Sequence, residues 1–464
     1  MPRPFSLDNV LEYPLPLPAP NMIVPSKPSK PITFPAPEDP SDAVVAIVSH
    51  QKGRNYYIYE REETWYIGLD SYVSLTVSSD GAQLTRYSRN EGDEVVPVTE
   101  PLPMFARDFI SEYSAHGNIF GHVGFNYSAH VFGRSTVAVS RDGITVSGCV
   151  EDEVRSLCKF VKVYLSVSHE VPTTTPTCQS QMAIDLRVNE SEYKARVSTA
   201  VPEIRNGHYA KVVPSRIVHL PSRVDMLATL QQGHRSNTPA RTFSFNHMGI
   251  QAIGFSPELI VSIKGRDICT EAVAGTRLRD NTTDSNSPPS ALLSDPKEVI
   301  EYVGAIRESV KRLARVCSSR TIVVSDFLSV VDRGNVQNLC SHVSGRLSPD
   351  KDGWDDLPGE GTQGVLVGED IQKFEPVPRE LYCGAVVMVD PSADYFEATL
   401  ALRSVFQDQK RQWLQAGAGI SAISDPDREF VETCEMLASI APYVVPEASL
   451  CREVGDENGP HELD

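Results

Sequence analysis

Apolar runs that are typical of β-strands follow one another along this 464-residue chain with no predicted helix between them. Two such runs lie at Thr242–Asn246 and Leu259–Ile263, and two more lie at Thr321–Ser325 and Val336–Leu347. Consecutive parallel strands need a long crossover, usually a helix, whereas consecutive antiparallel strands do not. The order therefore predicts an α+β fold, a single large domain of antiparallel sheets flanked by helices, rather than a doubly wound α/β fold.

The remaining predicted elements differ between the two halves of the chain. From Asp42 to about Gly148 the short alternating runs predict antiparallel strands, at Ala43–Val48, Tyr56–Tyr59, Trp65–Leu69 and Ser135–Ser147. A helix is predicted at Pro103–Ala115. After Ser191 long helices alternate with strands. The predicted helices there are Ser191–Arg205, Pro296–Val316 and Pro426–Ile440, and the further strands are Lys211–Leu220, Ala385–Val389 and Trp413–Gly419.

These patterns divide the chain into four parts. Residues 1–40 hold twelve prolines, which predicts an extended segment. A β-rich half follows at 41–180 and ends in the connector Pro172–Thr177; a second half at 181–446 carries the candidate site. Residues 447–464 form an acidic tail. No repeat of solenoid period is present, so we expect the two halves to share one domain.

The composition excludes several classes of function. With 43 Lys and Arg against 61 Asp and Glu, the net charge of −18 argues against nucleic acid and anionic membranes as partners. No apolar run is long enough to span a membrane, and prolines interrupt the first thirty residues. Nine cysteines without a C-x-x-C pair indicate buried thiols in a reducing compartment. We therefore expect a cytoplasmic monomer that acts on a small anionic molecule.

Two stretches, Ser294–Glu301 and Ser424–Glu432, each begin with Ser-Asp-Pro and then place two glutamates three residues apart. The aspartate is a good N-cap, and proline at the first helical position loses no hydrogen bond. At spacing i, i+3 both carboxylates of a pair point the same way. Oxygen ligands of this kind suit Mg²⁺. Either pair by itself is more typical of a solvated helix face, and only the other motifs of the chain favour a metal site over that interpretation.

The segment Gln415–Ala422 contains G-x-G-x-x-A between a predicted strand and a predicted helix. The same pattern forms dinucleotide phosphate loops. A nicotinamide site also needs a later parallel strand that ends in an acid, and the chain leaves no room for one. Binding of an anion by these N–H groups and simple close packing both remain open.

Three charged residues lie in apolar surroundings and are candidates for catalysis or binding. Lys211 begins an apolar strand, where burial would lower its pKa and suit it to act as a base; a lysine at a strand edge is the alternative. Glu258 follows Gly-Phe-Ser-Pro, a rigid turn in an apolar setting that would raise its pKa toward use as a general acid. Arg403 needs a carboxylate partner, either structural or from a ligand.

Six motifs in the second half resemble one known family. They are G-H-Y-A-K-V-V-P-S-R at 207–216, G-F-S-P-E-L at 254–259, E-A-V-A-G-T-R at 271–277, R-E-L-Y-C-G-A-V at 379–386, A-G-A-G-I at 416–420 and R-E-F-V-E-T-C-E at 428–435. From about Ser191 to Val445 the chain resembles the Mg-dependent chorismate-utilising enzymes, which share the fold of anthranilate synthase component I. Within them it is most similar to the salicylate synthases. The first 180 residues match only loosely.

The resemblance implies a set of roles for the candidate residues. Glu301 and Glu432 would bind Mg²⁺, with Glu298 and Glu429 adjacent, and the metal would hold the ring carboxylate of chorismate. Lys211 matches the base that activates water for attack at ring C2, and Glu258 matches the acid that protonates the departing C4 hydroxyl. Thr276 matches a residue that lines the ring. The clamp on the pyruvyl carboxylate matches Tyr382, Arg403 and the Gly417 amide.

We therefore expect an isomerase and lyase that converts chorismate through isochorismate to salicylate and pyruvate. Three positions differ from the family pattern: Asn338 replaces a histidine, Met436 replaces a lysine, and the loop at 358–365 is shortened. They leave open an enzyme that stops at isochorismate, one that performs a related ring elimination or rearrangement, and a catalytically silent relative that only binds.

Overall fold

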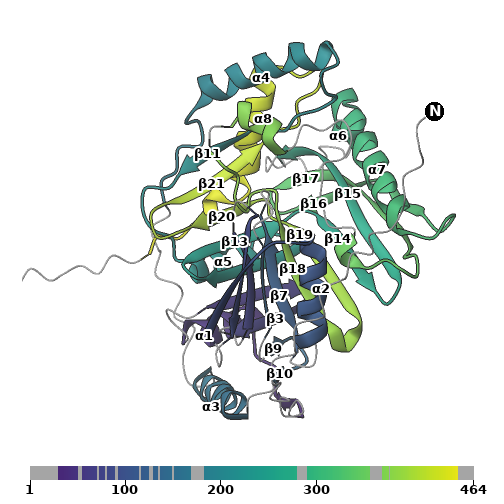
Figure 1. Cartoon of the computed structure of the whole chain (residues 1–464). Helices are drawn as coiled ribbons and strands as arrows, with labels where there is room; N and C mark the ends of the chain where they lie inside the picture. The colour runs from purple at the N-terminus through teal and green to yellow at the C-terminus, as the bar shows by residue number, and fades with distance from the viewer. Residues whose placement is uncertain are drawn as a thin grey trace, which may run out of the picture.

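The computed structural model describes residues 30–50, 55–69, 73–78, 81–88, 92–113, 117–124, 129–133, 136–148, 151–168, 182–278, 290–355, 368–375 and 377–447. Most of the proline-rich segment, the connector Pro172–Thr177, the shortened loop at 358–365 and the tail after residue 447 lie outside these ranges. Two large sheets dominate the described part (Figure 1), and all pairings between its named strands are antiparallel.

The first sheet has ten strands, five from each half of the chain. Their order is β1 (Ile32–Phe34), β10 (Ile144–Ser147), β9 (Thr136–Val139), β3 (Thr64–Leu69), β2 (Tyr56–Arg61), β12 (Arg241–His247), β13 (Ile250–Ser256), β20 (Ser404–Gln407), β21 (Gln412–Gly417) and β11 (Ser215–His219). The two halves meet where β2 pairs with β12.

The second sheet has eleven strands and also joins the two halves, where β7 pairs with β18. Their order is β16 (Val323–Arg333), β17 (Val336–Arg346), β15 (Asp267–Leu278), β14 (Leu259–Lys264), β19 (Tyr395–Leu400), β18 (Ala385–Asp390), β7 (Ile119–Val123), β8 (Ala129–Gly133), β4 (Val73–Val77), β5 (Gln83–Ser88) and β6 (Gly92–Pro97). Because each sheet contains strands of both halves, the chain forms one domain, which confirms the predicted fold class.

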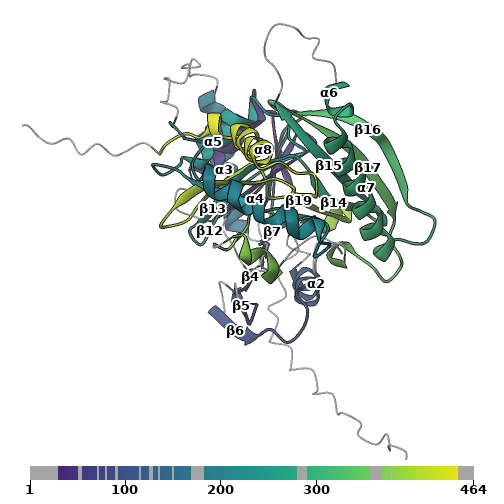
Figure 2. The ribbon, with the colours of Figure 1, turned by 90° about the horizontal axis from the view of Figure 1, so that it is seen from above.

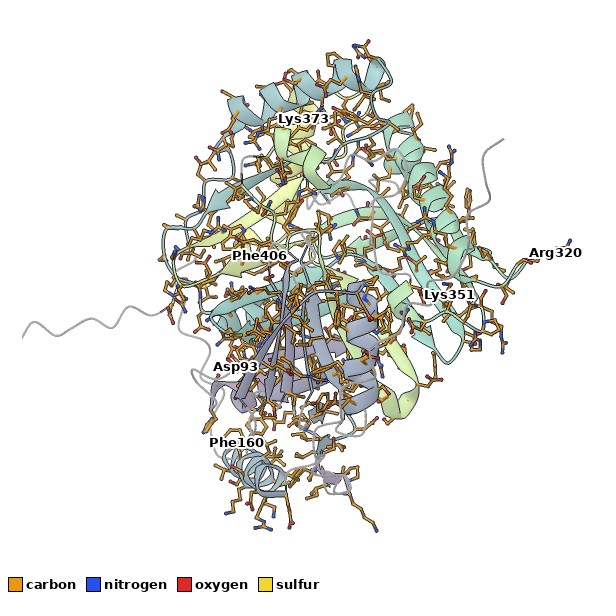
Figure 3. All side chains as sticks on the ribbon, in the orientation of Figure 1. Asp93, Phe160, Arg320, Lys351, Lys373 and Phe406 are labelled. Carbon is orange, nitrogen blue, oxygen red and sulfur yellow. The ribbon has the colours of Figure 1, made fainter. Side chains whose placement is uncertain are left out.

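The two sheets pack face to face, because successive side chains of a strand point to opposite faces and every second one enters the space between the sheets. Tyr57 and Tyr59 lie in a buried cluster with Val386 and Met388 of the other sheet, while Tyr56 and Ile58 point to the opposite side of β2. Phe406, labelled near the centre of Figure 3, belongs to the cluster between the sheets. This cluster is strongly aromatic, and the burial of its large side chains stabilises the packing of one sheet on the other.

Helices cover the two outer faces. Against the first sheet pack α1 (Pro40–Ser49), α3 (Glu151–Ser168), α5 (Met226–His234) and α8 (Pro426–Ala438); against the second pack α2 (Leu102–Tyr113) and α7 (Pro296–Val316). The short α6 (Ser290–Leu293) precedes α7, and α4 (Glu190–Arg205) lies on α8, as Figure 2 shows from above. No helix among the described residues is long and apolar enough to cross a membrane.

Most predicted elements of the second half have their counterparts within a few residues, but one strand of the first half was predicted wrongly. Ala43–Val48 lies in helix α1. Asp39 caps this helix by accepting a hydrogen bond from the Ser41 N–H (2.7 Å), and Pro40 occupies the first turn. The apolar run is continuous, and such a run does not separate a strand from a buried helix face.

We expect two glycine-to-alanine substitutions in helices to have opposite effects on stability. In α5, a Cβ on Gly233 would lie 2.2 Å from Phe255 Cζ, so Gly233→Ala should lower the free energy of unfolding by ~1–3 kcal/mol. In α7, a Cβ on Gly304 would have nothing within 4 Å, so Gly304→Ala should raise it by ~0.5–1 kcal/mol. Urea unfolding measures both, and two changes of the same sign would contradict this packing.

Candidate active site

A cavity of about 200 Å³ lies where ends of both sheets meet helices α7 and α8. Eight of the candidate residues predicted from the sequence line this cavity. They are Lys211, Glu258, Thr276, Glu301, Tyr382, Arg403, Gly417 and Glu432. They come from the strands, helices and connections of the second half. Glu298 and Glu429 lie outside the lining, in contact with Lys297 or Arg428 behind it.

The two Ser-Asp-Pro stretches form the starts of α7 and α8, as predicted. Asp295 accepts a hydrogen bond from the Lys297 N–H (3.0 Å), and Asp425 accepts from the Arg428 N–H (3.0 Å). Arg428 of α8 then reaches across to Asp295 (2.6 Å) and Glu298 (3.0 Å) on α7. One guanidinium therefore links the two helix starts next to the glutamate pairs.

Lys297 lies among the glutamates of both helices. Its Nζ is 2.7 Å from Glu432 Oε2, 3.0 Å from Glu429 Oε1 and 3.9 Å from Glu301 Oε1. Its side chain is 6% exposed, so an ammonium group is buried with the carboxylates. Sequence reasoning missed this residue, although its position directly before Glu298 and four residues before Glu301 was visible.

Burial and mutual repulsion control the protonation of this acidic cluster. Burial raises the pKa of Glu298 and of Glu301; Glu432 adds to both shifts, and Lys297 opposes them. Burial alone would lower the pKa of Lys297, but Glu432, Glu429 and Glu301 raise it above its usual range. The amine is therefore charged at neutral pH and offsets part of the negative charge.

The cluster has the chemistry of a site for a hard cation. Glu298 Oε2 and Glu301 Oε1 are buried and have no hydrogen-bond partner in the described part of the chain. Unsatisfied carboxylate oxygens and oxygen-only donors are what Mg²⁺ accepts. Gly275 makes room for Glu298, because a Cβ there would lie 2.7 Å from Glu298 Oε2. Among the described residues, no three acidic, histidine or cysteine side chains are arranged to hold a metal as they stand.

Lys211 reaches the cavity across a glycine. The main chain of Val212 exchanges hydrogen bonds with Ile420 (3.2 and 2.8 Å), which brings Lys211 next to Gly419. A Cβ on Gly419 would lie 2.7 Å from Lys211 Nζ and 3.6 Å from Glu301 Oε1. The strand predicted at Lys211–Leu220 is β11, which begins at Ser215, so Lys211 lies before the strand and not at its first position. A glycine is required at position 419 so that the Lys211 side chain can pass close to the backbone there. The glycine-rich segment in the sequence was the feature that indicated such a close approach.

Close packing also explains the other glycine of the segment Gln415–Ala422. Gly417 ends β21, and a Cβ on it would lie 2.6 Å from the Pro214 carbonyl oxygen. The Ala418 N–H already donates to Tyr193 Oη (3.1 Å). Because β21 pairs antiparallel with β11 and β20, the segment does not belong to a parallel dinucleotide-binding unit.

Glu258 lies in the link between β13 and β14. Its carbonyl oxygen accepts hydrogen bonds from Thr399 Oγ1 (2.9 Å) and from the Leu400 N–H (3.2 Å). The residue keeps some accessible surface where it borders the cavity, but protein atoms surround the carboxyl group. This burial, reinforced by the charge of Glu271, raises the pKa of Glu258 to about 8. The group can therefore hold a proton at neutral pH and donate it.

Arg403 forms a second polar wall of the cavity together with Asn338. Arg403 Nη2 donates to Asn338 Oδ1 (2.9 Å), and Asn338 Nδ2 donates to Thr276 Oγ1 (3.0 Å) and to the Gly275 carbonyl. Burial, with Arg333 adding to it, lowers the pKa of Arg403, yet a guanidinium stays charged at neutral pH. No carboxylate of the described residues forms an ion pair with Arg403, so a ligand anion would satisfy it.

Two further lining residues bear on the binding of an anion. Tyr382 is buried beside Cys383 and packs in the cluster between the sheets. Met436, at one of the three positions that differ from the family pattern, lines the cavity and packs on the outer core, so its thioether supplies no charge there. Lys297 behind the acidic residues and Arg403 in the opposite wall bring positive charge to the site.

Residues 75–359 and 364–442 match the chorismate binding enzyme family. The chain belongs to this family of chorismate-utilising enzymes. The match covers strands of both sheets and every residue of the candidate site.

Individual relatives agree with this assignment. A salicylate synthase of Mycolicibacterium paratuberculosis is 31% identical over 447 residues, which cover 89% of this chain and 96% of that protein. Anthranilate synthase component 1 of Spirochaeta aurantia is 31% identical over 260 residues, 54% of each chain. The structure of MenF, the menaquinone-specific isochorismate synthase of Escherichia coli, superposes with a TM-score of 0.68 at 19% identity, over 91% of this chain and 96% of that one. This last likeness establishes the fold.

The raised pKa of Glu258 predicts how the stability of the protein depends on pH. An unfolded glutamate titrates near 4.3, and the folded one at about 8. Between these values the folded state keeps a proton that the unfolded state has lost, so the free energy of unfolding falls as the pH rises. The stabilisation is complete below about pH 4.3 and is lost through pH 8.

Glu258→Gln removes this titration. The difference in unfolding free energy between the wild type and Glu258→Gln, measured by urea unfolding at each pH, should therefore decline from about pH 4.3 to about pH 8. Two parallel stability curves would show that Glu258 is ionised at neutral pH.

Proposed function

We propose that this protein is an Mg-dependent salicylate synthase that converts chorismate through isochorismate to salicylate and pyruvate. The observation that carries the proposal is the meeting, in one cavity, of the Lys211 amine with the Glu258 carboxyl, which holds a proton at neutral pH. The salicylate synthase relative, aligned over nearly its whole length, supports the same product.

The first step requires one base and one acid. Lys211 would take a proton from the water whose oxygen forms a bond to ring C2, and Glu258 would give its proton to the C4 hydroxyl, which leaves as water. The ring double bonds shift between these two positions, so no oxidant or reductant is needed. The raised pKa of Glu258 keeps its proton available near pH 7.

The second step is an elimination of pyruvate that needs positioning more than proton transfer. The bond between ring C3 and the enolpyruvyl oxygen breaks while the C2 hydrogen moves to the enolpyruvyl methylene carbon, which gives salicylate and pyruvate. A small cavity that holds the side chain over the ring favours this step. Asn338, which neither accepts nor releases a proton at neutral pH, is compatible with it.

The charged walls of the cavity fit the two carboxylates of chorismate. Arg403, aimed by Asn338, would bind the pyruvyl carboxylate together with Tyr382 and the Gly417 amide, and Thr276 would line the ring. Glu301 and Glu432, with Glu298 and Glu429 adjacent, would hold Mg²⁺, whose positive charge attracts the ring carboxylate. The unsatisfied oxygens of Glu298 and Glu301 support this placement.

The cellular setting is part of the same proposal. Six cysteines among the described residues are free thiols, as expected of a protein in the reducing cytoplasm. The acidic net charge of −18 favours a soluble protein that works as a monomer.

Incubation of the purified protein with chorismate and Mg²⁺ tests the proposal. Salicylate is followed by its fluorescence, and the products are separated by chromatography. We expect equimolar salicylate and pyruvate, and loss of turnover when EDTA removes the metal. Glu258→Gln should lower the rate ~10²–10⁴-fold, while the matched change Glu308→Gln, on the outer side of α7, should leave it unchanged.

The products decide between the alternatives. Isochorismate without salicylate would replace the proposal by an isochorismate synthase. Absence of any chorismate conversion from pH 6 to 9 would contradict the enzyme assignment and favour a relative that only binds.

A further inference from the structure

The backbone on both sides of Glu258 is held by one ion pair. Arg333 Nε donates to the carbonyl oxygen of Pro257 (3.1 Å), and Glu271 Oε2 accepts from the N–H of Leu259 (2.8 Å). Arg333 Nη2 lies 3.3 Å from Glu271 Oε1, which closes the ring of contacts. The residues before and after Glu258 are therefore fixed by two side chains that also bind each other.

The pair is buried, and its two members come from different strands of the second sheet. Glu271 lies in the middle of β15 and Arg333 at the end of β16, with side chains 10% and 15% exposed. Removing both charges of an ion pair from water costs desolvation free energy. A buried pair next to an acid of the cavity therefore suggests a role at that acid rather than a gain in stability.

Both members of the pair act on the proton of Glu258 through their charges. The groups that face Glu258 are Glu271, Arg312, Arg333 and Lys211, together with the thiols of Cys340 and Cys383. Arg312 is fixed to the carbonyl of Ile260 and to Thr270 Oγ1. Among the described residues Glu271 is thus the nearby negative charge that favours the protonated acid, and Arg333 opposes it.

Glu271 carries its charge throughout the neutral range. Burial alone would raise its pKa, but the contacts with His342, Arg333 and the Leu259 N–H lower it below the usual value. His342 Nε2 lies 3.6 Å from Glu271 Oε1, and His342 Nδ1 lies 2.9 Å from Asp326 Oδ2 at the partly exposed side of the sheet. Glu271 therefore acts as a fixed negative charge behind Glu258.

We propose that Glu271 and Arg333 are positioning residues for Glu258, which fix the backbone on both sides of this acid and set, by their opposite charges, the pH range in which it keeps its proton. The catalytic consequence rests on the proposed function, because it assumes that Glu258 donates the proton. The electrostatic part does not depend on it.

Opposite substitutions separate this role from a merely structural one. Glu271→Gln keeps an oxygen that can accept from the Leu259 N–H but removes the charge. The alkaline limb of the kcat/KM profile for chorismate should then move to lower pH by about one pH unit. Arg333→Gln removes the opposing charge and should move the same limb to higher pH. A structural role alone would lower stability in both variants and leave the limb in place.

A second measurement keeps the test independent of catalysis. The pH dependence of unfolding of each variant is compared with that of the same variant carrying Glu258→Gln, which reports the titration of Glu258 directly. Because Arg333→Gln takes the guanidinium away from the buried Glu271 and leaves it with His342 and the Leu259 N–H, the neutral double variant Glu271→Gln with Arg333→Gln serves as a folded control. The alkaline limb of the kcat/KM profile of the double variant should lie between the limbs of the two single variants.

The outcomes distinguish the two proposals. Opposite shifts in the unfolding data support the inference even if the wild type does not convert chorismate, in which case only the proposed function fails. Unchanged titration of Glu258 in Glu271→Gln, or shifts in the same direction in both single variants, would overturn it.

Discussion

The burial of four glutamates around one lysine, where helices α7 and α8 begin, is the interaction on which the site depends. Carboxylates removed from water are costly unless opposite charge compensates them, and here the Lys297 ammonium contacts three of the four. Arg428 joins the two helices and holds the fourth, Glu298. The Asp-Pro caps and Gly275, whose φ of +69° suits glycine, bring these side chains together. A partly compensated acidic cluster beside a cavity is suited to bind a further cation.

The two interlocked sheets place complementary groups around that cavity. Lys211, Glu258 and Arg403 belong to connections separated by long stretches of sequence, and they meet because strands of one half pair into both sheets. Each has a neighbour that determines its state: Gly419 gives Lys211 room, Glu271 favours the proton on Glu258, and Asn338 directs Arg403. The site thus combines an acid that holds its proton with a guanidinium that has no carboxylate partner among the described residues.

Local sequence patterns predicted the helices of the site well. They could not predict the contacts between residues that are distant in the sequence. The Ser-Asp-Pro caps fixed the starts of α7 and α8, and eight candidate residues taken from the sequence line one cavity. Helix α1 was predicted as an alternating strand, but its apolar run is continuous and has no period that distinguishes a strand from a buried helix. The position of Lys297 between two helices, and the hydrogen bonds of Asn338 to residues about sixty positions away, depend on tertiary packing. The strand pairings that join the halves, such as β2 with β12, are likewise set by the fold as a whole.

The central claim is that the acidic cluster and the arginine wall form one binding site for Mg²⁺ and an anionic ring substrate. Calorimetric titration of MgCl₂ into Glu258→Gln, with and without saturating chorismate, tests it directly, since this variant should bind without turnover. The account predicts that chorismate increases the Mg²⁺ affinity by about fivefold or more, and that Mg²⁺ increases the chorismate affinity by the same factor. Equal Mg²⁺ affinities with and without chorismate, or no Mg²⁺ binding, would contradict it.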